Sequence, residues 1–264
     1  MTAEVATAPL VFITGASSGI GQALARRYAV AGWRLALVAR RATELTEWTQ
    51  AQGWGPERCQ VYRADVSVMD EIIGAAQACL ARQGVPEVVV ANAGISIGMD
   101  SAVRADLDVM ARIFATNNLG LAATFHPFIE PMRQRGRGTL VGIASVAAIR
   151  GLPGHGAYCA SKAAVVSYCE SLRGELRGAG VRVLTLAPGF VDTPLTRGNR
   201  YPMPFMMTAD AFARRAVRAI AAGTSYRVIP WPMGAAAKLL RLLPNALFDR
   251  LLAGRPRKAR QAQP

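Results

Sequence analysis

The chain has few of the residues on which metal centres and secreted scaffolds depend. Its 264 residues include two histidines, His126 and His155, and four cysteines, Cys59, Cys79, Cys159 and Cys169. Neither histidine stands at metal-ligand spacing from a cysteine or carboxylate, so no metal site is predicted. The cysteines form no Cys-x-x-Cys pair and no disulfide framework, and we therefore expect reduced thiols.

Long apolar runs and targeting signals are also missing. No apolar run approaches the roughly 18 residues of a membrane-spanning helix, and residues 1–8 lack the basic and then apolar pattern of a secretory signal. Acidic residues are scarce, and the formal net charge is +14. The basic residues are dispersed, without a recognition motif or a basic helix interleaved with aromatics, so nucleic acid is not an expected partner. These absences predict a cytoplasmic protein.

The order of apolar and helical segments predicts an α/β fold. Strand-like runs alternate with helical stretches, at 9–14, 34–39, 60–63, 87–91, 139–144, 182–187 and 226–230. The runs are apolar throughout rather than alternating, which is typical of parallel strands covered on both faces. We predict a flexible N-terminus (1–8), one dinucleotide-binding catalytic domain (9–230), a C-terminal helical extension (231–253) and a basic disordered tail (254–264).

A glycine-rich turn follows the first strand. Gly15, Gly19 and Gly21 stand between the apolar run and a helical segment. Glycines allow a tight turn and close approach of a phosphate, and the following helix start presents backbone N–H groups. The spacing Gly-x-x-x-Gly-x-Gly differs from the usual Gly-x-Gly-x-x-Gly. The arrangement of strand, turn and helix nevertheless predicts a dinucleotide site.

The second predicted strand, 34–39, is followed directly by Arg40 and Arg41. At this position a dinucleotide-binding fold places the residue that binds the adenosine ribose. No carboxylate stands there to bind a free 2′-hydroxyl. Two guanidinium groups suit a 2′-phosphate instead. The sequence therefore favours NADP(H) over NAD(H), with two ordinary surface arginines as the alternative.

Tyr158 and Lys162 stand four residues apart in a helical segment, so that both project from one face. A phenol has a pKa of roughly 10, and a nearby ammonium lowers that pKa toward neutrality. The pair is then able to exchange a proton with a carbonyl or alcohol oxygen. A solvated helix face is the alternative interpretation of this spacing alone.

Taken together, these motifs resemble the short-chain dehydrogenase/reductase family. The resemblance rests on Thr14-Gly15-x-x-x-Gly19-x-Gly21, Asn92-Ala93-Gly94, Ser145, Tyr158-x-x-x-Lys162 and Pro188-Gly189, in this order, and extends over about residues 9–229. It implies a Rossmann-type, doubly wound parallel sheet of about seven strands with helices on both faces. It also implies hydride transfer between a nicotinamide and an alcohol/carbonyl pair.

The resemblance implies catalytic roles for four residues. Tyr158 donates the proton to the carbonyl oxygen in reduction, and Lys162 lowers the pKa of Tyr158 and binds the nicotinamide ribose. Ser145 hydrogen-bonds the substrate oxygen, and Asn117 positions a water that relays protons to the lysine. The adjacent Asn118 is expected to be a helix-surface or cofactor-side amide.

The resemblance also implies a set of cofactor contacts. Backbone contacts are expected from Ser17 and Ile20 in the phosphate turn, Asp65 meets the adenine amino group or is an ordinary helix cap, and Asn92, Ala93 and Gly94 lie beside the adenosine ribose. Pro188, Gly189 and Thr193 contact the carboxamide.

Two segments are expected to decide the substrate. Residues 195–208 contain YPMPFMM, which suggests an apolar, adaptable lid or else a plain surface loop, and residues 231–253 predict two short apolar helices separated by Pro244. We expect a lipophilic or aromatic carbonyl substrate. A 3-oxoacyl-carrier-protein reductase and a non-catalytic NADP-binding scaffold are the alternatives.

The C-terminal helices are also expected to bear on partners. They could cover the pocket, pack on a second subunit or rest on a membrane surface. A homodimer or homotetramer is implied by the resemblance. His155, close to Tyr158, is expected either to line the substrate mouth or to be an exposed loop imidazole.

Overall fold

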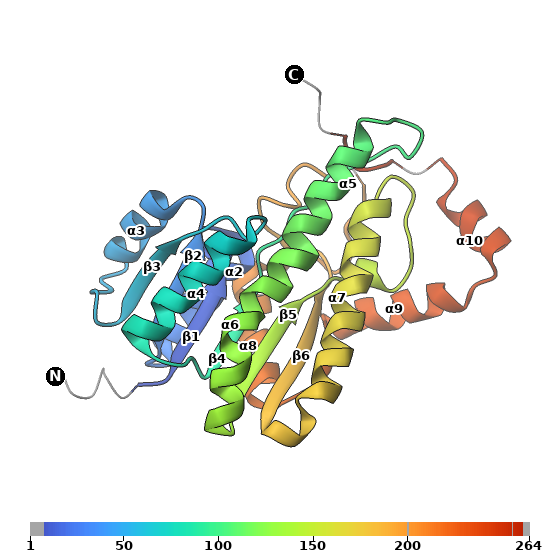
Figure 1. The fold of residues 1–264 in the computed structure, drawn as a ribbon. Helices are drawn as coiled ribbons and strands as arrows, with labels where there is room; N and C mark the ends of the chain where they lie inside the picture. The colour runs from blue at the N-terminus through green and yellow to red at the C-terminus, as the bar shows by residue number, and fades with distance from the viewer. Residues whose placement is uncertain (1–7, 200, 255, 261–264) are drawn as a thin grey trace.

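Seven short apolar runs form one parallel sheet in the computed structural model, which describes residues 8–199, 201–254 and 256–260 (Figure 1). The strands are β1 (Leu10–Thr14), β2 (Arg34–Ala39), β3 (Cys59–Arg63), β4 (Val88–Ala91), β5 (Gly138–Ile143), β6 (Val181–Pro188) and β9 (Tyr226–Ile229). Their order across the sheet is β3-β2-β1-β4-β5-β6-β9, and all neighbouring pairs are parallel. Each strand lies within one residue of its predicted bounds.

Helices cover both faces of this sheet, which explains why the strands are apolar throughout. One face carries α2 (Gly19–Val30), α3 (Ala42–Ala51) and α8 (Ala209–Ala221), and the other carries α4 (Met69–Gln83), α6 (Gly120–Arg135) and α7 (Gly156–Glu175). In β1, Phe12 packs toward the α6 side, where its ring lies 4.8 Å from that of Phe128, while Ile13 packs toward the α2 side. The predicted Rossmann-type architecture is confirmed.

The remaining short elements connect the layers. They are α5 (Asp106–Phe114), a π-helical turn (Ala115–Leu119), two 3₁₀ turns (Val146–Ala148 and Arg177–Ala179) and a two-stranded sheet of β7 (Val191–Asp192) and β8 (Met207–Thr208). The helix α5 continues through the π turn into α6, as the green ribbon in Figure 1 shows.

The order of strands creates a crevice at the carboxyl end of the sheet. The chain passes from β1 outward to β2 and β3, and then returns to β4 on the other side of β1. The segments after β1 and β4 therefore diverge, and ligands of open α/β sheets bind at such a switch point.

The C-terminal extension forms two helices, as predicted. They are α9 (Trp231–Leu242) and α10 (Asn245–Leu252), separated by Pro244, and Figure 1 shows them projecting from the body of the molecule. Within the described residues no helix is both long and apolar enough to cross a membrane.

The tail after α10 differs from the disordered segment predicted for residues 254–264. Gly98 forms a parallel bridge with Arg260, and the Arg260 guanidinium donates to the Asp106 carboxylate at 2.7 and 3.1 Å. An almost fully buried carboxylate needs a charged partner, and Arg260 supplies it. Residues 255 and 261–264 of this prediction, and 1–7 of the predicted flexible N-terminus, lie outside the described residues.

Candidate active site

A cavity of about 430 Å³ opens at the carboxyl ends of the central strands. Sixteen predicted site residues line it: Gly15, Ser17, Gly19, Ile20, Arg40, Arg41, Asp65, Asn92, Ala93, Gly94, Ser145, Tyr158, Lys162, Pro188, Gly189 and Thr193. The other two predicted residues, Gly21 and Asn117, do not line the cavity and support its wall from behind. The sheet thus gathers residues from seven segments of the chain at one edge.

The glycine turn has the shape of a phosphate cradle. Gly15 and Gly19 have φ angles of +66° and +54°, a region that L side chains rarely adopt. A Cβ on Gly21 would lie 2.2 Å from the Gly15 carbonyl oxygen, so only glycine lets α2 begin this close to the turn. The cavity wall therefore consists of backbone at the start of a helix, which fits a dinucleotide pyrophosphate.

Asn92 and Thr14 hold the turn in place from the neighbouring strand. The Asn92 side-chain amide donates to the carbonyls of Thr14 at 2.9 Å and Gly15 at 3.2 Å. The Thr14 hydroxyl in return accepts from the backbone N–H groups of Asn92 and Ala93, at 3.1 and 3.2 Å. These bonds couple the ends of β1 and β4, so Asn92 has a structural task besides the predicted ribose contact.

Arg40 and Arg41 stand at the opposite end of the cavity from Tyr158, after β2. Arg40 Nη1 lies 3.5 Å from Asp65 Oδ2, and Arg41 Nη2 donates to the Ser17 hydroxyl at 3.4 Å. Both arginine side chains remain more than half exposed, and Arg41 Nη1 also pairs with the Glu44 carboxylate at 3.0 Å. Two guanidinium groups, each with a carboxylate partner, therefore lie beside the glycine turn.

Asp65 has a local role in addition to lining the cavity. Its Oδ1 accepts from the backbone N–H and the hydroxyl of Ser67, at 2.9 and 2.7 Å. Burial raises the pKa of Asp65, but the hydrogen bonds from Ser67 and the charge of Arg40 outweigh burial and lower it. Asp65 forms an Asx turn before α4 rather than the helix cap itself, which is Val68.

Ser145, Tyr158 and Lys162 meet at the inner end of the cavity. Tyr158 and Lys162 lie one turn apart on α7, with Lys162 Nζ 5.9 Å from the centre of the Tyr158 ring. Ser145 begins the 3₁₀ turn after β5, and its hydroxyl accepts from the Ala147 N–H at 3.2 Å. Lys162 is buried and donates to the Ile143 carbonyl at 2.8 Å. The predicted one-face arrangement of tyrosine and lysine is present.

The pKa of Tyr158 differs from the predicted lowering. Burial is the largest effect and raises the pKa to about 12, while the hydrogen bond with the Ser145 side chain opposes the rise. Burial lowers the pKa of Lys162 to about 8. The lysine ammonium is engaged with the Ile143 carbonyl rather than with the phenol oxygen, so desolvation dominates both groups. Tyr158 is therefore a protonated phenol at neutral pH.

Asn117 holds the loop after β4 that packs against Lys162. The π-helical turn places its buried amide against the loop after β4, where Oδ1 accepts from the Ile95 N–H at 2.9 Å and Nδ2 donates to the Ile95 carbonyl at 3.0 Å. A Cβ on Gly94 would lie 3.2 Å from Asn117 Oδ1 and 3.3 Å from Lys162 Nζ. Asn117 and Lys162 thus converge on Gly94.

Asn118 is half-buried and does not line the cavity, so it is not a cofactor-side amide. Its Nδ2 donates to the Ser161 carbonyl of α7 at 2.8 Å, so it joins the π turn to α7. The Ser161 hydroxyl accepts from Asn117 Nδ2 at 2.9 Å. Both asparagines therefore position α7.

His155 is not an exposed loop imidazole, and it is not among the residues that line the cavity. It is buried, and its Nε2 lies 3.2 Å from the Tyr201 hydroxyl, while Nδ1 lies 3.4 Å from the Pro153 carbonyl. A carbonyl only accepts, so Nδ1 carries the proton and Nε2 accepts from Tyr201. Burial, opposed by the Pro153 carbonyl, keeps the pKa of His155 below its usual value.

Sequence reasoning missed several residues that line the cavity. They are Ser18, Val38, Ala39, Ala64, Val66, Ile95, Thr116, Ile143, Ala144, Val191 and Pro194, while Leu195 and Thr196 belong to the predicted lid. Most are apolar residues at strand ends, which carry no chemical signal of their own. Adjacency to a predicted site residue is the one signal that would have found most of them.

Comparison with known proteins gives consistent matches. The family model described as short chain dehydrogenase matches residues 9–203. An uncharacterized oxidoreductase of Myxococcus xanthus (strain DK1622) is 39% identical over 240 residues, covering 90% of this chain and 93% of the relative.

Two solved structures show the same fold. A short chain dehydrogenase/reductase from Burkholderia phymatum in complex with NAD has a TM-score of 0.80 at 26% identity, covering 97% of both chains. An alcohol dehydrogenase from Thermococcus sibiricus complexed with 5-hydroxy-NADP has a TM-score of 0.73 at 28% identity, covering 84% of this chain and 95% of that one. Structures with this fold thus bind either nicotinamide dinucleotide.

Proposed function

Because the chain belongs to the short-chain dehydrogenase/reductase family, we propose that it is an NADP(H)-dependent oxidoreductase that interconverts a secondary alcohol and a ketone. The observation that carries the proposal is the convergence of Ser145, Tyr158 and Lys162 at one end of a cavity whose other parts are a glycine cradle and two arginines. The nicotinamide supplies or accepts the hydride when it is bound. The protein supplies the proton and the orientation.

The proton moves through Tyr158. As a protonated phenol at neutral pH, Tyr158 is the donor to the carbonyl oxygen during reduction and the acceptor from the alcohol during oxidation. The Ser145 hydroxyl hydrogen-bonds the same oxygen and stabilises the charge that develops on it. Lys162 provides a positive charge behind the phenol, and Asn117 holds the loop against which this lysine packs.

The preference for NADP(H) rests on Arg40 and Arg41. Both guanidinium groups are exposed beside the glycine turn, and the position after β2 carries no carboxylate that would bind a free ribose 2′-hydroxyl. A 2′-phosphate would receive charge-assisted hydrogen bonds from both. Asp65, next to Arg40, has its Oδ1 held by Ser67 and its Oδ2 beside the Arg40 guanidinium.

The substrate is proposed to be a lipophilic or aromatic carbonyl compound. Leu195 lines the cavity, and Phe205 and Met206, in the segment proposed as the lid, are about half exposed at the same side of the sheet. A polarizable, methionine-rich segment adapts to apolar ligands of different shape.

The oligomeric state and location are also proposals. We propose a cytoplasmic homodimer or homotetramer. The large exposed apolar side chains of α9 and α10, namely Trp231, Leu239, Leu242, Leu247 and Leu251, form a surface for a second subunit or, secondarily, for weak contact with a membrane surface. Analytical ultracentrifugation with and without Leu242→Asp tests the subunit contact.

Titration with nucleotides tests the proposed function. Protein fluorescence is followed during addition of NADPH and, separately, NADH, and the NADPH complex is then offered a panel of ketones while absorbance at 340 nm is recorded. We expect tighter binding of NADPH and oxidation with lipophilic ketones. Preference for NADH would overturn the role of the arginines, and binding without turnover of any carbonyl compound would favour the scaffold alternative. Turnover restricted to carrier-bound acyl groups would favour the carrier-protein reductase.

A further inference from the structure

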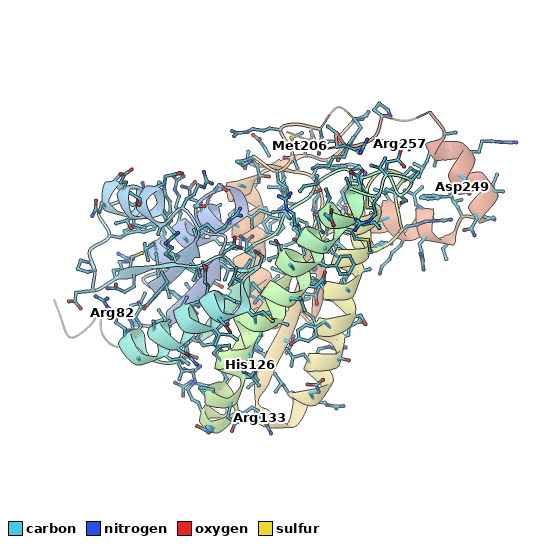
Figure 2. The ribbon with its side chains drawn as sticks, turned by 45° about the horizontal axis from the view of Figure 1, so that its top comes forward. Arg82, His126, Arg133, Met206, Asp249 and Arg257 are labelled. Atoms are coloured by element: carbon cyan, nitrogen blue, oxygen red, sulfur yellow. The ribbon has the colours of Figure 1, made fainter. Side chains whose placement is uncertain are left out.

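The tail residues 256–260 return to the body of the molecule near Leu195 and the proposed lid, which we call the substrate end. Figure 2 labels Arg257 of this tail and Met206 of the proposed lid at the same end of the molecule, far from Arg133 at the other end of α6. The tail packs on two glycines: a Cβ on Gly98 would lie 2.2 Å from the Lys258 carbonyl oxygen, and one on Gly154 would lie 2.9 Å from Arg257 Cβ. Such close approach leaves no space for a side chain at either position.

Hydrogen bonds and an ion pair fix the tail there. The Gly98 N–H donates to the Ala259 carbonyl at 3.1 Å. The Asp106 carboxylate, 7% exposed, binds Arg260 through both oxygens and also accepts from the Asp100 N–H at 2.7 Å. The tail is therefore fixed to the body of the molecule rather than being a loose end.

The fixed position of the tail brings Lys258 next to a residue that lines the cavity. Its Nζ donates to the carbonyl of Leu195 at 3.2 Å, and Leu195 lines the cavity. Among the described residues no carboxylate lies within ion-pair distance of Lys258. An ammonium has three donors, and the structure engages one of them. Lys258 is also partly buried, and this burial lowers its pKa.

The cavity itself connects the position of Lys258 with Tyr158. Leu195, whose carbonyl accepts from Lys258, and Tyr158 both line this cavity. His155 accepts from Tyr201, and the charge of Lys258 contributes, behind burial, to the lowered pKa of His155. A carbonyl compound with its reacting oxygen at Tyr158 would direct its remainder through the cavity toward Leu195 and Lys258.

We propose that Lys258 is a specificity-determining residue that binds an anionic group, a carboxylate or sulfonate, at the end of the carbonyl substrate remote from the reacting carbon. The inference rests on the proposed function, and it narrows the substrate class to apolar carbonyl compounds with an acidic end. The anion supplies the partner that the described residues do not give this ammonium. A neutral substrate of the same shape leaves the ammonium unpaired and is disfavoured.

Matched acid and ester substrates test the proposal. The probes are 4-oxopentanoate, 7-oxooctanoate and 4-acetylbenzoate, each compared with its methyl ester, and NADPH oxidation is measured at 340 nm. The wild-type protein is expected to prefer at least one acid over its ester by about 10- to 100-fold in kcat/KM, as for one charge-assisted hydrogen bond. Lys258→Met is expected to remove that preference by weakening the acid alone, and Lys258→Arg to retain most of it.

The controls separate this role from others. Lys238→Met removes an exposed lysine of α9 and is expected to change neither acid nor ester turnover. Equal losses for acid and ester, or a weaker NADPH titration in Lys258→Met, would overturn the proposal, because the lysine would then serve structure or the cofactor. An ester preference in the wild-type protein would also overturn it.

A binding measurement keeps the proposal independent of turnover. If none of the six probes is reduced, calorimetry of the protein saturated with NADP⁺ is performed with the three acids. Binding of an acid that Lys258→Met abolishes supports the anion site even if the proposed function fails. No binding of any acid overturns the anion site and leaves nucleotide binding as a separate result.

Discussion

The two ends of the candidate site are built differently. At the cofactor end, the glycine turn, Asn92 and Thr14 are joined by hydrogen bonds between side chains and backbone, at the ends of two adjacent buried strands. At the substrate end, the segment around Leu195 is supported by the tail 256–260, about sixty residues later in the chain, which is held by one ion pair and a few hydrogen bonds.

The two ends of the cavity differ in how closely neighbouring atoms confine each residue. A Cβ at Gly21 meets backbone that cannot move without shifting a strand. Gly15 is equally confined. By contrast, Phe205 and Met206 are about half exposed. The cofactor end is therefore expected to tolerate little substitution, and the substrate end to tolerate more and to set selectivity.

The largest effect is expected at the junction of the two ends. Tyr158→Phe removes the proton donor without changing the shape of the cavity, so kcat should fall by at least about 1,000-fold, while the Kd of NADPH stays within about twofold of wild type. Both values come from NADPH oxidation and fluorescence titration. Tyr168→Phe, on the same helix but partly exposed, is the matched control and should retain activity. Retained activity in Tyr158→Phe would remove this residue from the mechanism.

A substitution in the cradle should break the cofactor end. Gly21→Ala places a methyl group 2.2 Å from the Gly15 carbonyl and 2.7 Å from Asn92 Nδ2. We expect a loss of about 2–4 kcal/mol in the free energy of unfolding, together with a large loss of NADPH affinity, measured by urea denaturation and by titration. Gly74→Ala is the control, because its Cβ meets nothing within 4 Å on an exposed helix position. Wild-type stability and affinity in Gly21→Ala would show that the turn adapts.

Removing the charge of Arg40 should affect the affinity for one nucleotide only. Arg40→Ala is expected to weaken the binding of NADPH by about 10- to 100-fold, the equivalent of one charge-assisted hydrogen bond. The affinity for NADH should stay within about threefold of wild type. Competitive titrations of the two nucleotides measure the ratio. Arg104→Ala, an exposed arginine before α5, controls for the change in net charge. Equal losses for both nucleotides would mean that Arg40 does not read the 2′-phosphate.

The buried lysine should give the nucleotide-free protein a pH-dependent stability. The pKa of Lys162 is about 8 in the folded chain and 10.5 in the unfolded one, so the unfolded chain binds more protons between these values and stability rises as pH increases from about 8 to 10.5. Lys162→Met should abolish this rise. The quantity to compare is the free energy of unfolding of Lys162→Met minus that of wild type. This difference should be more favourable to the variant at pH 7 than at pH 10.5, by on the order of 1–3 kcal/mol.

Urea denaturation at several pH values measures this difference. The lost hydrogen bond to the Ile143 carbonyl lowers the stability of Lys162→Met equally at every pH, so the difference between pH values is the informative quantity. Lys238→Met, at an exposed position, should follow the wild-type profile. An unchanged rise in Lys162→Met would assign it to other groups.

The sheet and the cofactor end were predictable because their signals are local. Seven apolar runs became seven strands within one residue, and each glycine of the turn stands where a Cβ would collide. The direction of the Tyr158 pKa was not predictable, because it depends on burial rather than on the spacing of Tyr158 and Lys162. The tail was predicted to be disordered because a short basic segment does not indicate a specific partner. Its partner, the buried carboxylate of Asp106, is 154 residues earlier in the sequence than Arg260.

Assembly order gives the tail a further consequence. Synthesis proceeds from the N-terminus at roughly 5–20 residues per second, so about ten to thirty seconds separate the emergence of Asn92 from that of Lys258. The strands that carry the phosphate cradle are thus synthesised long before the tail. A chain cut before Pro256 would keep every described hydrogen bond between Asn92 and the glycine turn, yet it would lack the tail that contacts Leu195 at the substrate end. Nucleotide binding and substrate selection should therefore mature at different times on the ribosome.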